Sequence, residues 1–262
     1  MARNKAELVS RFGVNAFVFT LAGFVYKGSG SEDWSDVTRL NTHYGAMTLT
    51  CITSLNSCVM PVLLGFASEY PIVVRERMDG TYLITTYVLA KLVIEAIVSA
   101  AQLSLCLVIV FLLVEFRGDY LTILAAAWLL AFANSSIASF VSAVATDAAT
   151  ATNIFPLVIT PQFLFSGFFV AMDQIPTYLR WAQFACSIKY ALNIIVLQEF
   201  QLTLCRQNSD DPAQAAANCK AFKESNDVDA HNTLREWLVL LSIFAGFRIA
   251  AIYVISRVDR VY

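Results

Sequence analysis

Charged side chains are scarce in this 262-residue sequence, so their few clusters are the first candidates for chemistry. The segment VVRERMDGTY, residues 73–82, carries Arg75, Glu76, Arg77 and Asp79 between two long stretches with almost no charge. Guanidinium and carboxylate groups in such a cluster can form charge-assisted hydrogen bonds with a partner protein. The simpler alternative is a solvated loop. Both interpretations place the segment in water.

Three further charged residues interrupt apolar stretches, namely Lys91, Glu95 and Arg248. A charge at a bilayer centre costs about 2.5–3.5 kcal/mol on insertion scales, so each side chain should face protein or extend toward the interface. Lys91 and Glu95 are one helical turn apart and can share partners on one helix face. These residues could either form contacts between helices or take a direct part in transport, and the sequence leaves both interpretations open. A proton relay is not predicted, because no series of carboxylates or histidines accompanies them.

The sequence contains no pattern typical of a catalytic, metal or nucleotide site. His43 and His231 are isolated, so we predict no metal site and no catalytic set of serine, histidine and carboxylate. The phosphate-binding pattern G-x-x-x-x-G-K-[ST] is absent, and the glycine-rich residues 27–31 (KGSGS) do not supply it. We therefore expect a protein that is not an enzyme and that binds no cofactor itself.

The composition is typical of a membrane protein. Of the residues, 58% are hydrophobic and 15% are charged, and the mean hydropathy is +0.62. A soluble domain of this length needs more charge to cover its surface. The net charge of −2 and the scattered basic residues argue against nucleic acid as a partner.

Uncharged runs of about 20 residues predict an all-α fold with six transmembrane helices in a single domain, residues 1–262. The expected helices are residues 12–27, 41–69, 88–114, 120–146, 148–171 and 237–256. Basic residues predominate in the short loops on the side of the two termini, which predicts a multi-pass protein with both termini in the cytoplasm. A cleaved signal sequence at the first run is the alternative, and it would leave five helices.

The long segment 173–235 is then extracellular and divides into two parts. Residues 175–200 are apolar and aromatic, but Arg180, Lys189 and Glu199 interrupt them too often for a span, so we expect helices that lie at or dip into the outer face. A polar part with Cys205 and Cys219 follows.

The cysteines of the sequence fall into two groups. In an oxidising compartment Cys205 and Cys219 are expected to pair, with a stabilisation of about 3 kcal/mol, although two free thiols or a bond to a second subunit are alternatives. The other four have apolar neighbours and are expected to be small packing residues. They are Cys51, Cys58, Cys106 and Cys186.

Several short patterns, in the same order along nearly the whole chain, resemble the G subfamily of ATP-binding-cassette transporters, the White, multidrug-resistance and sterol half-transporters of the ABC-2 type. R-E-x-x-x-G-x-Y followed by Y-x-L-x-K-x-x-x-E resembles their coupling loop and third helix. Residues 165–170 (FSGFFV) resemble the end of their fifth helix, residues 175–200 their extracellular re-entrant region, and residues 246–253 (GFRIAAIY) their sixth helix. The first pair of patterns consists of Arg75, Glu76, Gly80, Tyr82, Tyr87, Leu89, Lys91 and Glu95.

The resemblance implies a mechanism. A nucleotide-binding domain would hydrolyse ATP with Mg²⁺, a cytoplasmic coupling helix at residues 71–82 would receive its movement, and two membrane domains would alternate in a dimer. Coupling contacts would come from Arg75, Glu76, Arg77, Gly80 and Tyr82. The family places the nucleotide-binding domain before the first helix, and residues 1–10 are too few to hold it, so we expect it to be fused upstream or supplied by a separate chain.

The resemblance also implies a substrate path along the dimer interface. Thr53, Ser54, Asn56 and Ser57 fall where the multidrug members bind substrate, and Ser57 replaces an aromatic ring that would stack on flat drugs. Phe168 and Phe169 match the apolar valve of the family, which closes by excluding water. The alternative is that these two phenylalanines face lipid or belong to the core.

Two functions are therefore compatible with the sequence. The first is the membrane domain of an ATP-driven exporter of lipids, sterols or other amphipathic molecules, working among membrane lipids. The alternative is an ATP-independent channel or scramblase, or a truncated regulatory partner of complete half-transporters.

Overall fold

The structure is a computed structural model that describes residues 5–78, 84–145, 147–166, 186–207, 211–226 and 233–258, together with residues 181, 184 and 228. These residues form helices and connecting turns, and no strand occurs among them. The long helices are α1 (Lys5–Val25), α2 (Val37–Met78), α3 (Ile84–Val110), α4 (Tyr120–Val144), α5 (Ala148–Leu164) and α9 (Thr233–Val258). The short ones are the π-helical turn Phe111–Glu115, α6 (Ser187–Glu199), α7 (Leu202–Gln207) and α8 (Pro212–Ser225).

Five of the described helices are long and apolar enough to cross a membrane, which confirms the all-α membrane class. Their candidate spans are Leu8–Val25, Val37–Gly65, Thr85–Glu115, Tyr120–Val144 and Thr233–Ile255. The fifth predicted span corresponds to α5, which has 17 residues. Residues 167–180, which follow it, lie outside the described part of the chain. The count of six therefore remains a prediction.

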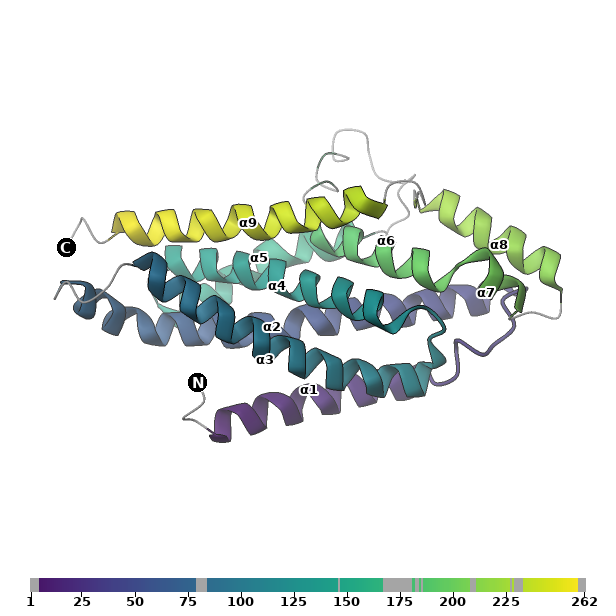
Figure 1. Cartoon of the computed structure of the whole chain (residues 1–262), viewed down its shortest axis with the longest axis horizontal. Helices are drawn as coiled ribbons and strands as arrows, with labels where there is room; N and C mark the ends of the chain where they lie inside the picture. The colour runs from purple at the N-terminus through teal and green to yellow at the C-terminus, as the bar shows by residue number, and fades with distance from the viewer. Residues whose placement is uncertain are drawn as a thin grey trace.

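The helices form an elongated bundle with α9 along one side and α1 along the opposite side (Figure 1). The first turn of α1 and the last turn of α9 lie toward the same end, which agrees with the expectation that both termini share one side. Helices α7 and α8 lie at the other end. We use "terminal end" for the end with the start of α1, and "distal end" for the end with α7 and α8.

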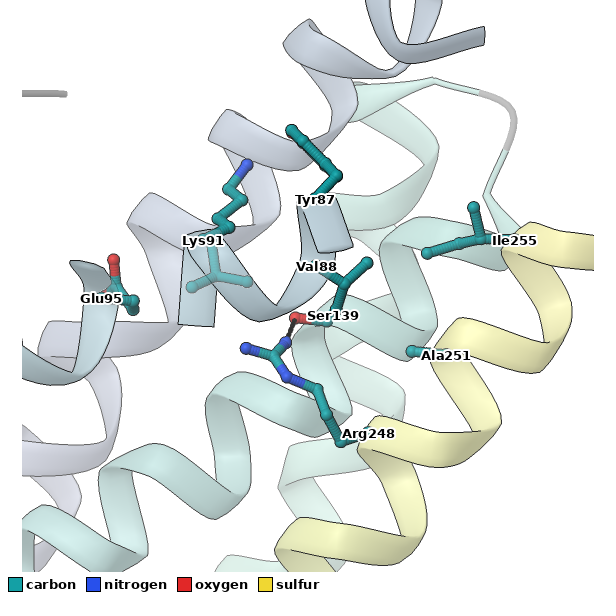
Figure 2. A pocket seen from close by; sticks show the side chains of 9 residues that line it. Tyr87, Val88, Lys91, Glu95, Ser139, Arg248, Ala251 and Ile255 are labelled. Atoms are coloured by element: carbon teal, nitrogen blue, oxygen red, sulfur yellow. Dashed lines mark hydrogen bonds between the residues drawn. The ribbon is translucent and has the colours of Figure 1, made fainter. Parts of the chain in front are cut away.

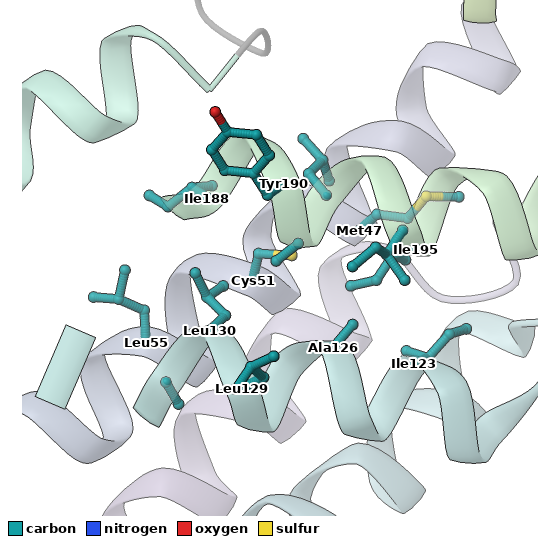
Figure 3. Packing of buried hydrophobic residues seen from close by; sticks show 14 of the residues in the cluster. Met47, Cys51, Leu55, Ile123, Ala126, Leu129, Leu130, Ile188, Tyr190 and Ile195 are labelled. Atoms are coloured by element: carbon teal, nitrogen blue, oxygen red, sulfur yellow. The ribbon is translucent and has the colours of Figure 1, made fainter. Parts of the chain in front are cut away.

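Helix α4 is the centre of the bundle and packs against α2, α6 and α9. Small side chains such as Ala126, Ala127 and Ala131 are completely buried on it, and they let neighbouring helix backbones approach closely. Figure 3 shows Met47, Cys51 and Leu55 of α2 meeting residues of α4 and α6 in this core. The four free cysteines are all buried, which confirms them as packing residues.

Helix α2 is longer than the sequence predicted. It runs without a break from Val37 to Met78, 42 residues, or about 63 Å at 1.5 Å per residue. The coupling helix expected at residues 71–82 overlaps α2, because residues 71–78 continue this helix, and its coupling role stays a prediction. The side chains of residues 66–78, and residues 79–83 altogether, lie outside the described part.

The described distal segments are helical. We expected helices that lie at or dip into the outer face, and nearly all residues of α6 are buried among α2, α4, α5 and α9, whereas the re-entrant arrangement stays a prediction. The polar part after α6 is helical, and its helix α8 begins at a clear signal. Asp211 accepts hydrogen bonds from the amides of Ala213 and Gln214, and Pro212 occupies the first helical position.

Cys205 of α7 and Cys219 of α8 form a disulfide bond, as predicted. Both cysteines are fully buried, and the bond joins two helices that also pack against each other. The alternatives of free thiols and of a bond to a second subunit do not apply to this structure.

Candidate functional site

Glu95 of α3 is held by an arginine from α1. Arg11 donates from Nη2 to Glu95 Oε1 at 2.6 Å and from Nη1 to Oε2 at 3.3 Å, so the pair is bidentate. The two side chains are only 7% and 4% exposed. The expectation that Glu95 faces protein is confirmed. This partner was unexpected, because Arg11 directly precedes the first expected span, residues 12–27, and nothing in the sequence connects it with Glu95.

Arg248 of α9 points toward α4, where its Nη1 donates to Ser139 Oγ at 2.7 Å. Its Nε is buried and has no hydrogen-bond partner among the described residues. The arginine predicted inside the last span therefore also faces protein, and it links α9 to α4.

A small cavity brings the three intramembrane charged residues together (Figure 2). Lys91 and Glu95 reach it from α3, and Arg248 reaches it from α9 beside Ser139. Lys91 also lies over the ring of Tyr87, with Nζ at 5.9 Å from the centroid. The cavity has a volume of about 20 Å³, enough for one water molecule. The remaining lining is apolar and comprises Val62, Val88, Ala251 and Ile255.

This polar cluster links four helices without the groups of a proton relay. Its one carboxylate is already paired with Arg11, and no histidine lines the cavity. Lys91 and Arg248 supply hydrogen-bond donors around a space that can hold one water molecule. The observed contacts join α1 to α3 through Arg11 and Glu95, and α9 to α4 through Arg248 and Ser139.

The four path residues on α2 divide between two faces of the helix. Ser54 and Ser57 are buried in the bundle, whereas Asn56 is exposed and Thr53 is half-buried. Each side chain donates to a carbonyl of its own helix, for example Asn56 Nδ2 to Ile52 O at 2.9 Å. The face that Thr53 and Asn56 share continues to Met60 and Leu64, which are 46% and 53% exposed. In a single chain only Thr53 and Asn56 are accessible to a substrate.

His43 is not isolated, and the sequence interpretation was wrong here. Its Nδ1 is 3.0 Å from Ser29 Oγ, and its Nε2 is 3.0 Å from Glu199 Oε1. Glu199 also accepts from the amides of Arg117 at 2.8 Å and Gly118 at 2.7 Å. This network joins α2, the end of α6 and two connecting segments.

The network is closed to solvent. His43 and Glu199 are fully buried, and Ser29 is 2% exposed. The rings of Trp34, Phe116 and Phe200 surround His43 with centroids at 5.2, 5.3 and 6.0 Å. A serine, a histidine and a carboxylate joined by hydrogen bonds resemble the catalytic set of a hydrolase. These three side chains are buried, however, so a substrate has no access to them. We interpret the network as a structural clamp at the distal end.

Sequence reasoning missed this clamp because its members are far apart along the chain. His43 and Glu199 are separated by 156 positions, so no local spacing connects them. The available signal was the family resemblance of residues 175–200, which includes Glu199 but gives no partner for it.

The other predicted site residues are only partly described. Arg75, Glu76 and Arg77 lie on the backbone of α2, but their side chains are outside the described part. Gly80, Tyr82, Phe168 and Phe169 are outside it altogether, as is His231. No group of three or more metal-binding side chains occurs among the described residues.

Comparison with known proteins adds an independent observation. The family described as ABC-2 type transporter matches residues 1–200. The chain is similar to Protein white of Ceratitis capitata, with 26% identity over 89% of this chain and 35% of that protein.

Two other relatives come from a nematode and a plant. ABC transporter ATP-binding protein/permease wht-1 of Caenorhabditis elegans is 28% identical over 70% of this chain and 29% of its own length. ABC transporter G family member 8 of Arabidopsis thaliana is 26% identical over 59% of this chain and 26% of its own length. The chain thus spans about a third, or less, of the curated relatives that it matches.

Proposed function

Because the chain belongs to the ABC-2 type transporter family, we propose that it forms the membrane domain of an ATP-driven exporter. It would act as a dimer and move lipids, sterols or other amphipathic small molecules. Its homology to White and to G-family transporters gives the membrane-transport role. The energy source, the dimer and the substrate class are our proposals.

The length of α2 is the observation that carries the proposal. The uncharged run of α2 ends at Ser68, but the helix continues to Met78, about 15 Å further at 1.5 Å per residue. The extension carries Arg75, Glu76 and Arg77, whose charges favour an aqueous location. A continuous helix anchored in the bundle core at Met47, Cys51 and Leu55 can transmit a push on this extension into the membrane.

A nucleotide-binding domain is the proposed source of that push. The sequence has no phosphate-binding pattern of its own. The name of the nematode relative assigns ATP binding and permease function to one polypeptide. We propose that further sequence upstream, or a separate chain, supplies this domain and binds ATP and Mg²⁺. The segment at residues 71–82 would then be the coupling element.

The substrate path is proposed along the exposed face of α2. Thr53 and Asn56 offer uncharged polar groups beside the apolar side chains of Met60 and Leu64. Two such faces opposed in a dimer would suit amphipathic molecules without a charge. Ser54 and Ser57 would support this face from inside the bundle, and Phe168 and Phe169 would form the valve.

The test is the substitution Glu76→Ala in the transporter assembled with its nucleotide-binding domain. Losing a charge-assisted contact worth about 1.5–3 kcal/mol should reduce the stimulation of ATP turnover by substrate at least several-fold, with normal expression. Glu224→Ala is the matched control, because Glu224 is exposed on α8 at the distal end. Unchanged stimulation in Glu76→Ala would overturn the coupling role, and a complex without ATP turnover would overturn the proposed energy source.

A further inference from the structure

Arg248 carries a charge inside the apolar span of α9, and its contacts leave that charge without a counter-charge. Its Nη1 donates to the neutral hydroxyl of Ser139, and its Nε is buried without a hydrogen-bond partner. No ion pair of Arg248 occurs among the described residues. A buried, unpaired donor on a charged group is costly within a membrane. An acceptor with a negative charge would compensate both the donor and the charge.

The carboxylate beside Arg248 is already engaged by another residue. Glu95 lines the same cavity, but its two oxygens accept from Arg11 at 2.6 and 3.3 Å. Arg11, Lys91 and Arg248 thus place three positive charges around one negative charge among the described residues of this cluster. In surroundings of low dielectric constant, such an excess of positive charge attracts an anion.

The cavity beside Arg248 has room for one small ion. Its volume of about 20 Å³ holds one water molecule, and a chloride ion is only slightly larger. Figure 2 shows the guanidinium group of Arg248 directed away from the backbone of α9 and toward Ser139. A sulfate ion or the phosphate group of a lipid has several heavy atoms and needs more space. The geometry therefore favours a monatomic anion.

We propose that this cavity binds one chloride ion, which accepts a hydrogen bond from Arg248 Nε and has the ammonium group of Lys91 as a second positive neighbour. The ion would stabilise the packing of α9 against α3 and α4 by offsetting their buried positive charge. This inference goes beyond the proposed export function and does not depend on it, because anion binding requires neither ATP nor a transported substrate.

The direct test is the binding of radiolabelled chloride to the purified full chain in nanodiscs of phosphatidylcholine. We expect saturable binding of one ion per chain. Bromide is similar in size and should displace the label, whereas sulfate should compete at least about tenfold more weakly because it does not fit. Absence of saturable binding, or equal competition by sulfate and bromide, would overturn the proposal.

Thermal unfolding supplies a second readout. A ligand that binds only the folded chain raises the unfolding midpoint. We expect a midpoint about 2–4 °C higher in about 150 mM sodium chloride than in sodium gluconate at the same concentration. Gluconate is an anion too large for the cavity, so the ionic strength stays constant. Equal midpoints in the two salts would contradict a bound chloride ion.

Variants then assign the effect to Arg248. Arg248→Met should reduce chloride binding at least about tenfold, because it removes a charge-assisted hydrogen bond. Arg206→Met is the matched control and should bind like the wild type, because Arg206 is exposed on α7 at the distal end. Wild-type binding by Arg248→Met would overturn the proposal.

Ser139→Ala tests the site even if Arg248→Met fails to fold. This variant keeps the guanidinium group and removes its neutral acceptor. The arginine then depends more strongly on the anion, so chloride binding should be retained or become tighter. Loss of chloride binding by folded Ser139→Ala would show that the guanidinium group does not hold the ion.

Discussion

Arg11 and Glu95 form a buried ion pair in which each charge needs the other for compensation. Desolvation of two charges offsets much of their attraction, so the pair itself adds little to stability compared with apolar residues of similar size. Removing one partner is different, because it leaves the other charge buried without compensation. That loss typically costs about 3–5 kcal/mol.

We therefore expect Glu95→Leu and Arg11→Met to lower the free energy of unfolding by about 3–5 kcal/mol each. The double variant should be more stable than either single variant, since no unpaired charge remains. Thermal unfolding of the purified protein in one detergent checks this. Additive losses in the double variant would show that the two side chains act independently.

The carboxylate of Glu199 is a second residue whose contacts depend on its charge. It accepts from His43 and from the amides of Arg117 and Gly118, so all three partners are placed as donors. A glutamine in its place would bring its own donor group toward one of them. The buried mismatch cannot be relieved by water, because His43 and Glu199 are fully buried.

We expect Glu199→Gln to destabilise the fold by about 2–3 kcal/mol, the cost of leaving a buried donor unsatisfied. Glu224→Gln is the control, with an expected change within about 0.5 kcal/mol because Glu224 is 69% exposed. Unfolding midpoints of the two variants and the wild type provide the measurement. A stability for Glu199→Gln equal to that of the control would contradict the clamp.

Among the elements, the turn after α1 depends on close backbone packing. The amides of Gly28 and Gly30 donate to the carbonyls of Leu113 and Val114, both at 2.9 Å. A Cβ atom on Gly30 would lie 2.1 Å from the carbonyl oxygen of Glu115. Glycine at this position is therefore a requirement of the docking between this turn and the π-helical end of α3.

Gly30→Ala should consequently separate the turn from α3 and lower the free energy of unfolding by more than about 2 kcal/mol, as overpacking against a backbone atom does. Gly13→Ala is a matched control inside α1, where no atom lies within 4 Å of the new Cβ. Alanine favours a helix there, so stability should rise or stay constant. Differential scanning fluorimetry would check both, and a tolerated Gly30→Ala would refute the packing argument.

The sequence predicted long apolar helices well and buried polar contacts poorly. Residues 120–146 were expected for α4 and the helix runs from Tyr120 to Val144, because an uncharged run after the helix-capping Asp119 leaves little choice. On account of Arg180, Lys189 and Glu199, residues 175–200 were expected to lie at or dip into the outer face, and α6 is largely buried in the bundle. Glu199 is buried there because His43, remote in sequence, satisfies it. Long-range pairs of this kind leave no periodic signal.

The whole molecule leaves several apolar faces uncovered. In α1 and in α9, only 17% of an apolar 18-residue stretch is buried inside the chain, compared with 72% for such a stretch of α4. Lipid can cover such faces, but the exposed face of α2 also carries Thr53 and Asn56. Polar groups on a lipid-facing surface are unfavourable, whereas a facing subunit or an enclosed substrate path can solvate them.

We therefore expect the dimer contact of the assembled transporter to lie on α2 rather than on α9. Asn56→Cys in membranes should give a disulfide-linked dimer under mild oxidation, whereas Ile249→Cys, on an exposed position of α9, should not. The four native free cysteines are buried and contribute little background. Immunoblotting without reductant measures the dimer fraction. Cross-linking through position 249 alone would move the interface to α9 and leave Thr53 and Asn56 without a role in the path.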